Sequence, residues 1–496
     1  MSEVQLKSQL SFFDVTNLVV GAIIGADVYV ASALGAKLLG PFSLVVWVIA
    51  GIIAIIIALC FAQCAALLPR VGGPYAYAHA AWGTFAGFIV GWSLYLAEWL
   101  SLAVFPVAFT NYLMYFFPTL SWAAQDGVKV LFVIFLIVTN TVGVKAAGRT
   151  NDVLTLVKLV PLLFFAVVGL VFVASNTGIA AGHYSPFAPL GFGGFGAALV
   201  LIFWAYAGFE ISTIPAEEIK DPSKTIPRAI VVGILIVTVF YLVTNIVLFG
   251  VMPSLPPPSS PTAQGYLATS NAPLATATNR ALLAIPAIAL IGAVIVGVGA
   301  LISVSGSDES GMIGTSRLGY ALAADGLFPR TFAKIHPKYK TPYWGIIIQA
   351  VTALVAAIVG NLTLLIATSV FFMAIAYLAT SGAIFSLRRK GIKAQFHLRG
   401  GLIIPSLGII FSIYLITQCT LTQIGLGFIM LAIGVPIYVK YSPKKEIAEL
   451  KGELLSSESR LRRAAQQEER FLAHALWHIK TYYRNRKGKG QTGNKA

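Results

Sequence analysis

Apolar runs of about 20 residues, the length that crosses about 30 Å of hydrocarbon as a helix, recur in this chain from Val15 to Lys440. Only 11% of the 496 residues are charged and 57% are hydrophobic, whereas charged residues make up about 25% of a soluble domain. The sequence therefore predicts an all-α polytopic membrane protein rather than a series of soluble domains.

Breaks at charged residues, prolines and glycines divide the apolar region into twelve predicted transmembrane helices. Residues 1–14 are polar and lack the apolar core of a signal peptide, so we expect the first span to be retained. The predicted spans are 15–38, 41–67, 85–117, 127–147, 152–174, 194–212, 229–252, 286–311, 343–360, 363–387, 402–419 and 423–440.

Lysine and arginine predict the orientation of these spans. Sixteen of these residues fall on one predicted side of the membrane, and three, Lys37, Lys129 and Arg280, fall on the other. Positive side chains accumulate on the cytoplasmic side. We therefore expect a multi-pass protein of the cell membrane with both termini in the cytoplasm, as an even number of spans requires.

The segment 441–496 is a basic tail with apolar residues at amphipathic spacing, Leu450, Leu454 and Trp477 among them. Next to the last span, such a tail can lie along the anionic inner leaflet or remain a charged, solvated coil, and the sequence leaves both open. The net charge of +16 is divided between the tail and the spans, which is not a nucleic-acid signature. We expect lipid, and not nucleic acid, as a partner.

Histidines and cysteines give no sign of a metal site. The six histidines are scattered, and Cys60, Cys64 and Cys419 lie inside apolar runs, where no disulfide framework is expected. A nucleophile elbow and a phosphate-binding loop are also missing from the sequence. The sequence therefore predicts no cofactor and no enzymatic activity.

Two spans contain interruptions that a plain membrane anchor does not need. The first carries Gly21, Gly25 and Asp27 at mid-depth, and the sixth carries Gly208 and Glu210. Glycine at such a break lets the backbone unwind, which frees amides for an anion and carbonyls for a cation. Because the two spans are five apart, corresponding segments of a repeat would enter the membrane in opposite directions. Glycine-mediated helix packing is the alternative explanation.

Six ionisable residues fall inside the predicted spans, where each costs at least about 2.5 to 3.5 kcal/mol at the helix centre. Residues of this kind often mark substrate or ion pathways. Asp308 and Glu309 are about 100° apart on a helix, so both can face the bundle amid neighbouring serines, with Ser303 and Ser307 among them. The six are Asp27, Glu98, Lys158, Glu210, Asp308 and Glu309.

Most of these residues also have a structural explanation. Asp27 can cap a half-helix that resumes after the break, and Glu210 can cap or anchor the end of its own broken helix. Glu98 lies beside Trp99, and we interpret it as a protonated, hydrogen-bonded core residue. Lys158 is the hardest to explain in this way, because apolar residues flank it and no interface is within snorkelling reach.

Four motifs follow one another along the chain: Gly21-Ala-Ile-Ile-Gly25; Pro69-Arg-Val-Gly-Gly73-Pro-Tyr75-Ala-Tyr77; Ala205-Tyr-Ala-Gly208-Phe-Glu210 with Glu217-Glu-Ile-Lys-Asp-Pro222 and Ile226-Pro-Arg-Ala229; and Ser316-Arg-Leu-Gly-Tyr-Ala-Leu-Ala-Ala-Asp325-Gly326-Leu-Phe-Pro329. They resemble parts of the amino acid-polyamine-organocation transporters, and within that group the bacterial and archaeal amino acid permeases. The resemblance runs from Leu10 to Lys440.

The resemblance implies a fold of two inverted five-helix repeats, at 15–174 and 194–387, with broken first and sixth helices, and two additional helices at 402–440. It also implies a substrate site at mid-membrane between the breaks. By position, the residues implied for this site are Ile24, Gly25 and Ala26 for a substrate carboxylate, Ala205, Ala207 and Gly208 for its ammonium end, and Trp204 as an aromatic lid.

Lys158 matches the fifth-helix lysine that some members of this group use for proton coupling in place of a sodium ion. The chain departs from the group at Gly25-Ala26-Asp27 and at Asp308-Glu309, where both changes add negative charge. These acids favour cationic substrates such as arginine, lysine or polyamines, because they repel a substrate carboxylate. Alternatively, one acid pairs with Lys158 and the other caps a helix, which leaves no preference.

The sequence thus predicts a secondary active transporter of amino acids or related amines, coupled to protons through Lys158 and with cationic substrates favoured. Two alternatives remain open: a sodium-independent exchanger, and a sensor with the same fold that binds substrate without transporting it. Accumulation of labelled substrate in proteoliposomes separates transport from sensing.

Overall fold

The computed structural model describes residues 11–25, 27–68, 72–142, 147–210, 219–260, 265–392, 394 and 400–443. The chain divides into two units, Met1–Tyr441 and Ser442–Ala496. Of the second unit, only residues 442 and 443 are described, so the interpretation of the basic tail falls outside the described residues. The first unit contains the predicted spans.

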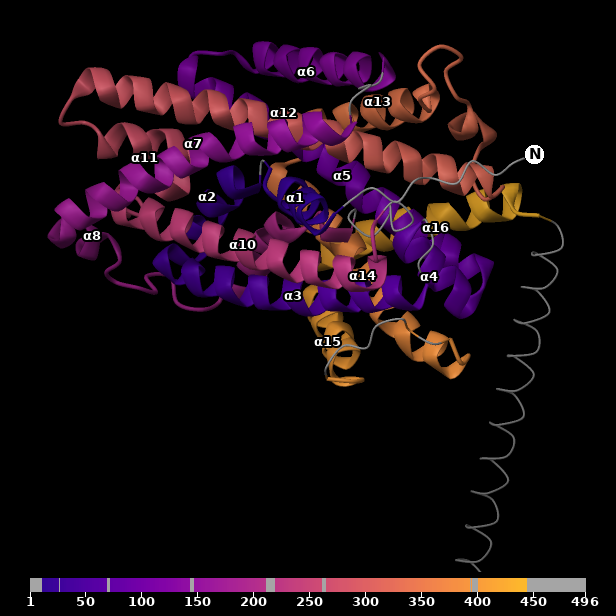
Figure 1. The fold of residues 1–496 in the computed structure, drawn as a ribbon. Helices are drawn as coiled ribbons and strands as arrows, with labels where there is room; N and C mark the ends of the chain where they lie inside the picture. Colours follow the sequence, from indigo (N-terminus) through magenta and orange to yellow (C-terminus); the bar gives the residue numbers. More distant parts are fainter. Residues whose placement is uncertain are drawn as a thin grey trace, which may run out of the picture. The chain divides into compact units, whose positions relative to one another are not determined.

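The described residues of the first unit form helices without β-strands (Figure 1). The longest of them follow the predicted spans within a few residues at most ends. In chain order the helices are α1 (Phe12–Ile23), α2 (Asp27–Leu39), η1 (Gly40–Phe42), α3 (Ser43–Leu67), α4 (Gly73–Trp82), α5 (Thr84–Phe116), α6 (Trp122–Val142), α7 (Ala147–Ser175), α8 (Thr177–His183), α9 (Phe195–Phe203), η2 (Trp204–Tyr206), α10 (Pro222–Val251), η5 (Leu267–Thr269), α11 (Pro273–Ala281), α12 (Pro286–Ala324), η6 (Arg330–Ala333), α13 (Tyr343–Val359), α14 (Leu362–Arg389), α15 (Ile403–Thr417) and α16 (Leu421–Tyr441).

Eight helical segments in the described part of the chain are long and apolar enough to cross a membrane. One of them, Asp27–Leu67, joins α2 and α3. Four shorter apolar helices accompany them: Phe12–Ile23, Phe195–Tyr206, Tyr343–Val359 and Ile403–Thr417. These helices confirm a polytopic membrane protein, while the count of twelve spans stays a prediction.

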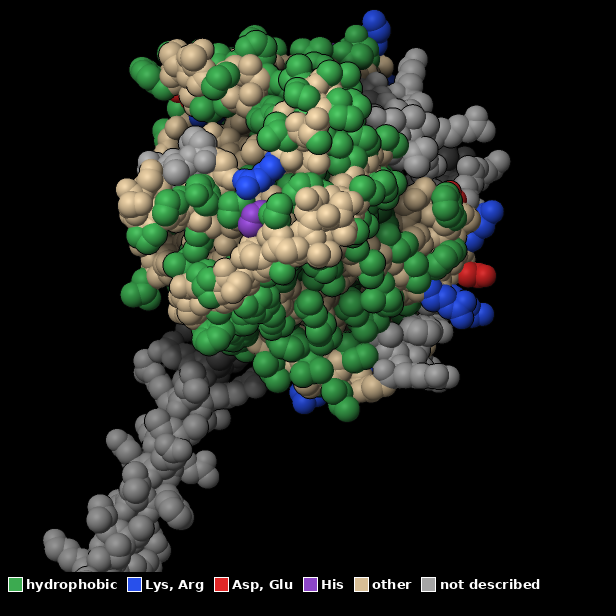
Figure 2. Space-filling view, turned by 90° about the vertical axis from the view of Figure 1, so that its left-hand side faces the viewer, with side chains coloured by type: hydrophobic (Ala, Val, Ile, Leu, Met, Phe, Trp, Pro, Cys, Tyr) green, Lys and Arg blue, Asp and Glu red, His purple; other side chains and the backbone are tan. Residues whose placement is uncertain are grey.

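Hydrophobic side chains cover much of the surface, as expected for helices that face lipid. Leu131 on α6, Val171 on α7 and Ile429 on α16 are all more than half exposed. Figure 2 shows one face of the molecule on which green, hydrophobic side chains predominate. A soluble monomer rarely exposes a contiguous apolar patch larger than a few hundred Å². The exposed residues therefore agree with a bilayer as the surrounding medium.

Small residues let the buried helices approach closely. α5 packs against both α14 and α12, and α10 packs against α3 and α1. At Gly51 on α3, an added Cβ would lie 2.8 Å from Thr238 on α10, and at Gly408 on α15 it would lie 2.6 Å from Ser381 on α14. Glycine is used in this way where apolar helices meet inside a membrane.

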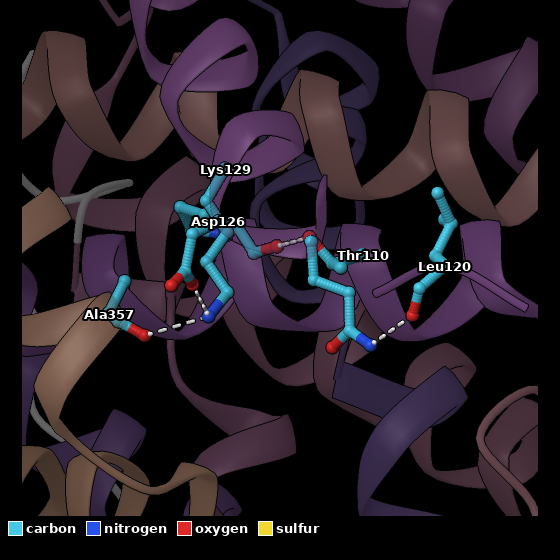
Figure 3. Close-up of polar contacts among 7 residues, drawn as sticks. Thr110, Leu120, Asp126, Lys129 and Ala357 are labelled. Atoms are coloured by element: carbon cyan, nitrogen blue, oxygen red, sulfur yellow. Dashed lines mark hydrogen bonds and ion pairs between the residues drawn. The ribbon is translucent and has the colours of Figure 1, made fainter. Parts of the chain in front are cut away.

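A polar contact at one end of α6 connects this peripheral helix to α13. Lys129 Nζ lies 2.9 Å from Asp126 Oδ1 and donates a longer hydrogen bond of 3.4 Å to the carbonyl oxygen of Ala357. Figure 3 shows this arrangement, together with the hydrogen bond from Gln125 to the carbonyl of Leu120. The pair is partly exposed, so its contribution to stability is small.

Candidate functional site

The first predicted span is broken between α1 and α2. Ile24 ends α1 in an extended conformation, and its N–H donates to the carbonyl of Val20 at 2.8 Å. Side chains from other helices reach the break: Tyr241 OH donates to the carbonyl of Ile23 at 3.1 Å, and Ser303 Oγ to that of Gly25 at 3.4 Å. Carbonyls freed by the break are thus partly satisfied from α10 and α12. Ala26 lies outside the described residues.

The sixth predicted span is broken after η2, at Gly208. This residue has a φ of +115°, which favours glycine. A Cβ added there would lie 2.6 Å from the carbonyl oxygen of Ala22, near the end of α1. Both the backbone conformation and the close contact therefore require glycine. The two breaks, nearly 190 residues apart in sequence, touch each other at this point.

Glu210 is buried behind the second break and holds it in place. Its Oε2 accepts a hydrogen bond of 3.0 Å from the backbone N–H of Gly208. Its Oε1 accepts one of 3.2 Å from the hydroxyl of Tyr377 on α14. Only 1% of the residue is exposed. These bonds agree with the capping interpretation of Glu210.

A cavity lies between the two breaks and encloses about 770 Å³ of empty space, part of it open to solvent. It brings together five of the predicted site residues, Asp27, Trp204, Ala207, Gly208 and Ser307. The other described candidates are not in its wall. The lining consists of Leu18, Gly21, Ala22, Asp27, Glu98, Ser101, Phe105, Trp204, Ala207, Gly208, Ser307, Ser310, Gly311 and Met373.

Trp204 forms part of this wall and is fixed by hydrogen bonds. Its indole Nε1–H donates to Ser101 Oγ at 3.1 Å, and Ser101 Oγ lies 3.0 Å from Ser369 Oγ. Ser369 in turn donates to the carbonyl of Ala97 at 2.8 Å. The ring of Phe105 lies 6.0 Å from the Trp204 ring, centroid to centroid. Trp204, the predicted aromatic lid, is therefore a buried side chain at the cavity that is fixed by its hydrogen bond to Ser101.

Lys158 on α7 is 5% exposed and reaches the cavity only through a serine. Its Nζ donates a hydrogen bond of 3.2 Å to Ser307 Oγ, and Ser307 lines the cavity. An added Cβ on Gly306 would lie 2.8 Å from Lys158 Cε, so the lysine packs closely on α12. Within the described ranges, no carboxylate forms an ion pair with Lys158. The alternative of a direct acid–lysine pair is thus not what the structure contains.

Asp27 begins α2 and lines the cavity with 7% of its surface exposed. Its carboxylate accepts a hydrogen bond from its own backbone N–H, and its Oδ2 lies 3.1 Å from the position of a Cβ on Gly25. No other described residue donates a hydrogen bond to it. The carboxylate therefore occupies the N-terminus of α2 and faces the cavity at the same time, which combines the two interpretations of Asp27.

Asp308 and Glu309 are absent from the described cavity wall. Asp308 is 1% exposed, and its Oδ1 has no hydrogen-bond partner among the residues described. Of the neighbouring serines, Ser303 binds the first break and Ser307 binds Lys158, whereas Ser305 donates to a carbonyl of its own helix. The polar seam of α12 thus joins the site through Ser303 and Ser307.

Glu98 is a cavity residue that the sequence interpretation placed in the core. It comes from α5 and lines the cavity, and no described residue donates a hydrogen bond to its carboxyl group. The hydrogen bonds expected for a core residue are thus not seen among the described residues, and the structure adds a place in the cavity wall. Residues three apart share a helix face, so Glu98 lies on the same face of α5 as Ser101, which accepts the hydrogen bond from Trp204.

Comparison with known proteins places these features in context. A family model described as amino acid permease matches residues 10–438. The chain is 29% identical to the branched-chain amino acid permease BcaP of Bacillus subtilis, with 89% of this chain and 94% of the relative covered. It is 28% identical to the methylthioribose transporter of the same organism, in an alignment that covers 89% of this chain and 95% of the relative. It is 27% identical to the serine/threonine exchanger SteT, also from Bacillus subtilis, in an alignment that covers 89% of this chain and 98% of the relative.

Proposed function

Because the chain belongs to the amino acid permease family and is a membrane transporter rather than an enzyme, we propose that it carries amino acids or related amines by proton-driven secondary transport. The proton binds at Lys158, and cationic substrates are favoured. The substrate occupies the cavity between the two helix breaks. The contact of Lys158 with Ser307, at the cavity wall, is the observation that carries the proposal.

Lys158 is suited to the coupling role by its position. A protonated ammonium offers three donors, and one of them goes to Ser307. Loss of the proton removes a positive charge from a buried position next to a wall that contains Asp27. The link between α7 and α12 at Ser307 then weakens, and this structural change, which has to outweigh the repulsion between the ammonium and a cationic substrate, is the proposed way in which the bound proton assists substrate binding. Binding of proton and substrate is thereby coupled.

The charges of the cavity wall support a preference for cations. Asp27 and Glu98 line the cavity, and no lysine, arginine or histidine is among its described lining residues. A monocation at 4 Å from a carboxylate gains about 4 kcal/mol at an effective dielectric near 20, before desolvation is subtracted. The N-terminus of α2 already holds the Asp27 carboxylate, so a substrate carboxylate is not needed there.

The names of the relatives are compatible with a preference for cationic substrates in this chain. BcaP is named for branched-chain amino acids and SteT for serine and threonine, whereas a third relative is named for methylthioribose, which is not an amino acid. Substrates therefore differ among relatives of similar identity to this chain. The side chains of the cavity wall are the expected cause of such differences.

Residues of α1 that precede the first break form part of the cavity wall. Leu18, Gly21 and Ala22 of α1 line it. Beyond the break, Tyr29 and Tyr112 are fully buried with ring centroids 5.5 Å apart, and Tyr112 OH donates to the carbonyl of Tyr29 at 3.2 Å. With the N-terminus in the cytoplasm, the contact between Tyr29 and Tyr112 follows the break on the way to the outer side, and we expect it to separate when substrate enters from outside.

The proposal also includes the arrangement of the helices in two repeats and the side of the membrane on which the termini lie. We assign 15–174 and 194–387 to two inverted repeats and 402–440 to two additional helices, supported by the two breaks and their mutual contact. The excess of lysine and arginine on one side supports cytoplasmic termini in the cell membrane. The residues at 441–496 then meet the anionic leaflet from the cytoplasm.

Uptake by purified protein in liposomes tests the proposed function. An inside-alkaline pH gradient is expected to drive accumulation of labelled arginine or lysine into vesicles that contain no substrate. Accumulation only into vesicles preloaded with an amino acid identifies an exchanger instead. Substrate binding without accumulation under either condition identifies a sensor. Replacement of sodium by potassium is expected to leave uptake unchanged.

A further inference from the structure

Glu309 on α12 is an acid that lies near Lys158 without being paired with it. Among the described residues, Asp27 and Glu309 are the charged groups that act electrostatically on Lys158, and Lys158 is the charged group that acts on Glu309. Lys158 and Glu309 do not form an ion pair, and Lys158 Nζ donates to Ser307 instead. A carboxylate at this place can exchange a proton with Lys158 through one water molecule or after its side chain rotates.

The packing of α7 on α12 places Glu309 beyond Lys158 along the helix (Figure 1). A Cβ added at Gly299 would overlap Pro161, and one added at Gly306 would lie 2.8 Å from Lys158 Cε. The contacts therefore move toward the N-terminus of α7 as α12 runs toward its C-terminus. Glu309 follows Gly306 by three residues, so it lies about one helical turn further in the direction of the C-terminal end of α12.

Glu309 and the substrate cavity lie on different sides of this helix contact. At about 100° per residue, Glu309 is about 60° from Gly306 in one direction, whereas Ser307 and Ser310 are about 100° and 40° from it in the other. Ser307 and Ser310 line the cavity, and Glu309 does not. Glu309 is partly exposed, whereas Lys158 is only 5% exposed. A proton that moves from Lys158 to Glu309 thus leaves its buried site without entering the space between the breaks.

No hydrogen bond from another described residue holds the Glu309 carboxylate, so capping and anchoring do not account for it. An acid inside an apolar span is costly and often belongs to an ion or proton pathway. We propose that Glu309 is a proton-relay residue, which takes the proton from Lys158 after substrate release and passes it to water toward the C-terminal end of α12. In the proposed orientation this end is cytoplasmic, because Arg330 and Lys334 follow it on the positively charged side.

The relay consists of two proton transfers. First an N–H bond of the Lys158 ammonium breaks, the electron pair stays on Nζ, and an O–H bond forms on the Glu309 carboxylate. The neutral carboxyl group then gives this proton to water and becomes a carboxylate again. The inference rests on the proposed function, since it assigns the route by which the coupling proton leaves Lys158.

Net uptake and exchange by the purified full-length protein in liposomes separate proton release from the other steps. Net uptake of labelled arginine under an inside-alkaline gradient requires Lys158 to release its proton in every cycle. Exchange of labelled for unlabelled arginine at equal pH does not, because the loaded protein returns with its proton. Glu309→Gln is expected to slow net uptake at least about tenfold and to leave the exchange rate within about twofold of the parent rate.

The pH inside the vesicles supplies a readout that a purely structural role does not change. Without the relay, water and hydroxide have to take the proton from Lys158 directly. The ratio of net uptake by Glu309→Gln to net uptake by the parent is therefore expected to rise toward one as the internal pH is raised. Glu309→Asp keeps a carboxylate and is expected to recover most of the net uptake at the lower internal pH.

Two further variants control for folding and for the loss of an acid from α12. Asp308→Asn removes the neighbouring acid, which is not among the charged groups that act on Lys158, and is expected to match the parent in net uptake and exchange. Thermal unfolding shows whether each variant is folded. Glu309→Ala is expected to give the same pattern as Glu309→Gln, and it decides the question if the glutamine variant does not fold.

The outcomes distinguish the relay from the function on which it rests. Net uptake at the parent rate in Glu309→Gln, or equal losses of net uptake and exchange that do not depend on internal pH, overturn the relay while proton-driven transport stands. Parent protein that does not accumulate arginine under the gradient overturns proton-driven transport, and the relay with it. Accumulation by the parent, with a loss in Glu309→Gln that is confined to net uptake and relieved by internal alkalinity, supports the relay.

Discussion

Lys158 Nζ lies 3.2 Å from Ser307 Oγ, and this hydrogen bond joins α7 to the cavity wall on α12. It is the one hydrogen bond of the Lys158 side chain within the described residues. An ammonium that is buried without an acid partner depends on such a contact. The protonation state of Lys158 therefore reaches the substrate through Ser307 and through the electric field at Asp27.

The Ser307→Ala variant tests the contact between Lys158 and the cavity. Loss of a hydrogen bond to a charged group, worth about 1.5 to 3 kcal/mol, is expected to reduce uptake driven by a pH gradient about ten- to hundredfold. Initial uptake rates in liposomes measure the effect. Ser305→Ala is the matched control, because Ser305 lies on the same helix and donates only to Leu301. Equal rates in both variants would remove Ser307 from the coupling pathway.

The Trp204→Ala variant tests the aromatic wall. A cation over an indole ring gains about 0.5 to 2 kcal/mol, so apparent affinity for a cationic substrate is expected to fall about two- to thirtyfold, with transport falling as well. Trp204→Phe keeps a ring but loses the hydrogen bond to Ser101, and a smaller loss is expected. Unchanged substrate affinity in Trp204→Ala would assign the residue to core packing alone.

The Gly208→Ala variant tests the contact between the breaks. A side chain at a φ of +115° costs about 1 to 3 kcal/mol, and its Cβ would also meet the carbonyl oxygen of Ala22. We expect a lower unfolding temperature and loss of uptake. Gly391→Ala provides the control, since Gly391 has a φ of +76° with nothing within 4 Å of an added Cβ. The account of the breaks is wrong if both variants lose the same stability and keep full uptake.

The Asp27→Asn variant tests charge selection in the cavity. Arginine, lysine, putrescine, leucine and glutamate compete against labelled substrate in the parent and in the variant. The parent is expected to prefer the cations, and the variant to lose at least about tenfold of that preference, because the carboxylate is the source of attraction. Asp308→Asn is the comparison, and it is expected to keep the preference because Asp308 is outside the described cavity lining. Tight leucine binding in the parent that is unaffected by Asp27→Asn would contradict the selection of cationic substrates by Asp27.

Hydrophobic runs predicted the helices well but missed where some of them end. The predicted span 286–311 corresponds to α12, which continues to Ala324 past Arg317. A run of apolar residues marks the segment that can lie in the lipid. The helix itself is held by backbone hydrogen bonds, which can continue beyond the apolar run. Interruptions were predicted in the first and sixth spans and are found there, and the backbone conformation requires glycine at Gly208. The family resemblance is also confirmed by the match over residues 10–438.

The cavity wall was predicted less completely, because its members come together from distant parts of the chain. Lys158 and Ser307 are 149 residues apart, and no local pattern pairs them. Ser307 and Asp308 are neighbours in sequence, yet only Ser307 lines the cavity. Helical periodicity separates their directions by about 100° but does not indicate which direction faces the substrate. The place of Glu98 in the cavity wall was not predicted for the same reason.

The Lys158→Met variant tests most directly whether this transporter is coupled to protons at Lys158. Methionine keeps much of the side-chain volume and cannot be protonated, so the folded variant is expected to bind substrate but not to accumulate it under a pH gradient. Lys129→Met is the control, because Lys129 belongs to the partly exposed pair on α6 and lies outside the cavity wall. The decisive measurement is the steady-state ratio of labelled substrate inside and outside liposomes with an inside-alkaline gradient. The account predicts a ratio near one for Lys158→Met and well above one for the parent and Lys129→Met, whereas accumulation by Lys158→Met at the parent level would contradict it.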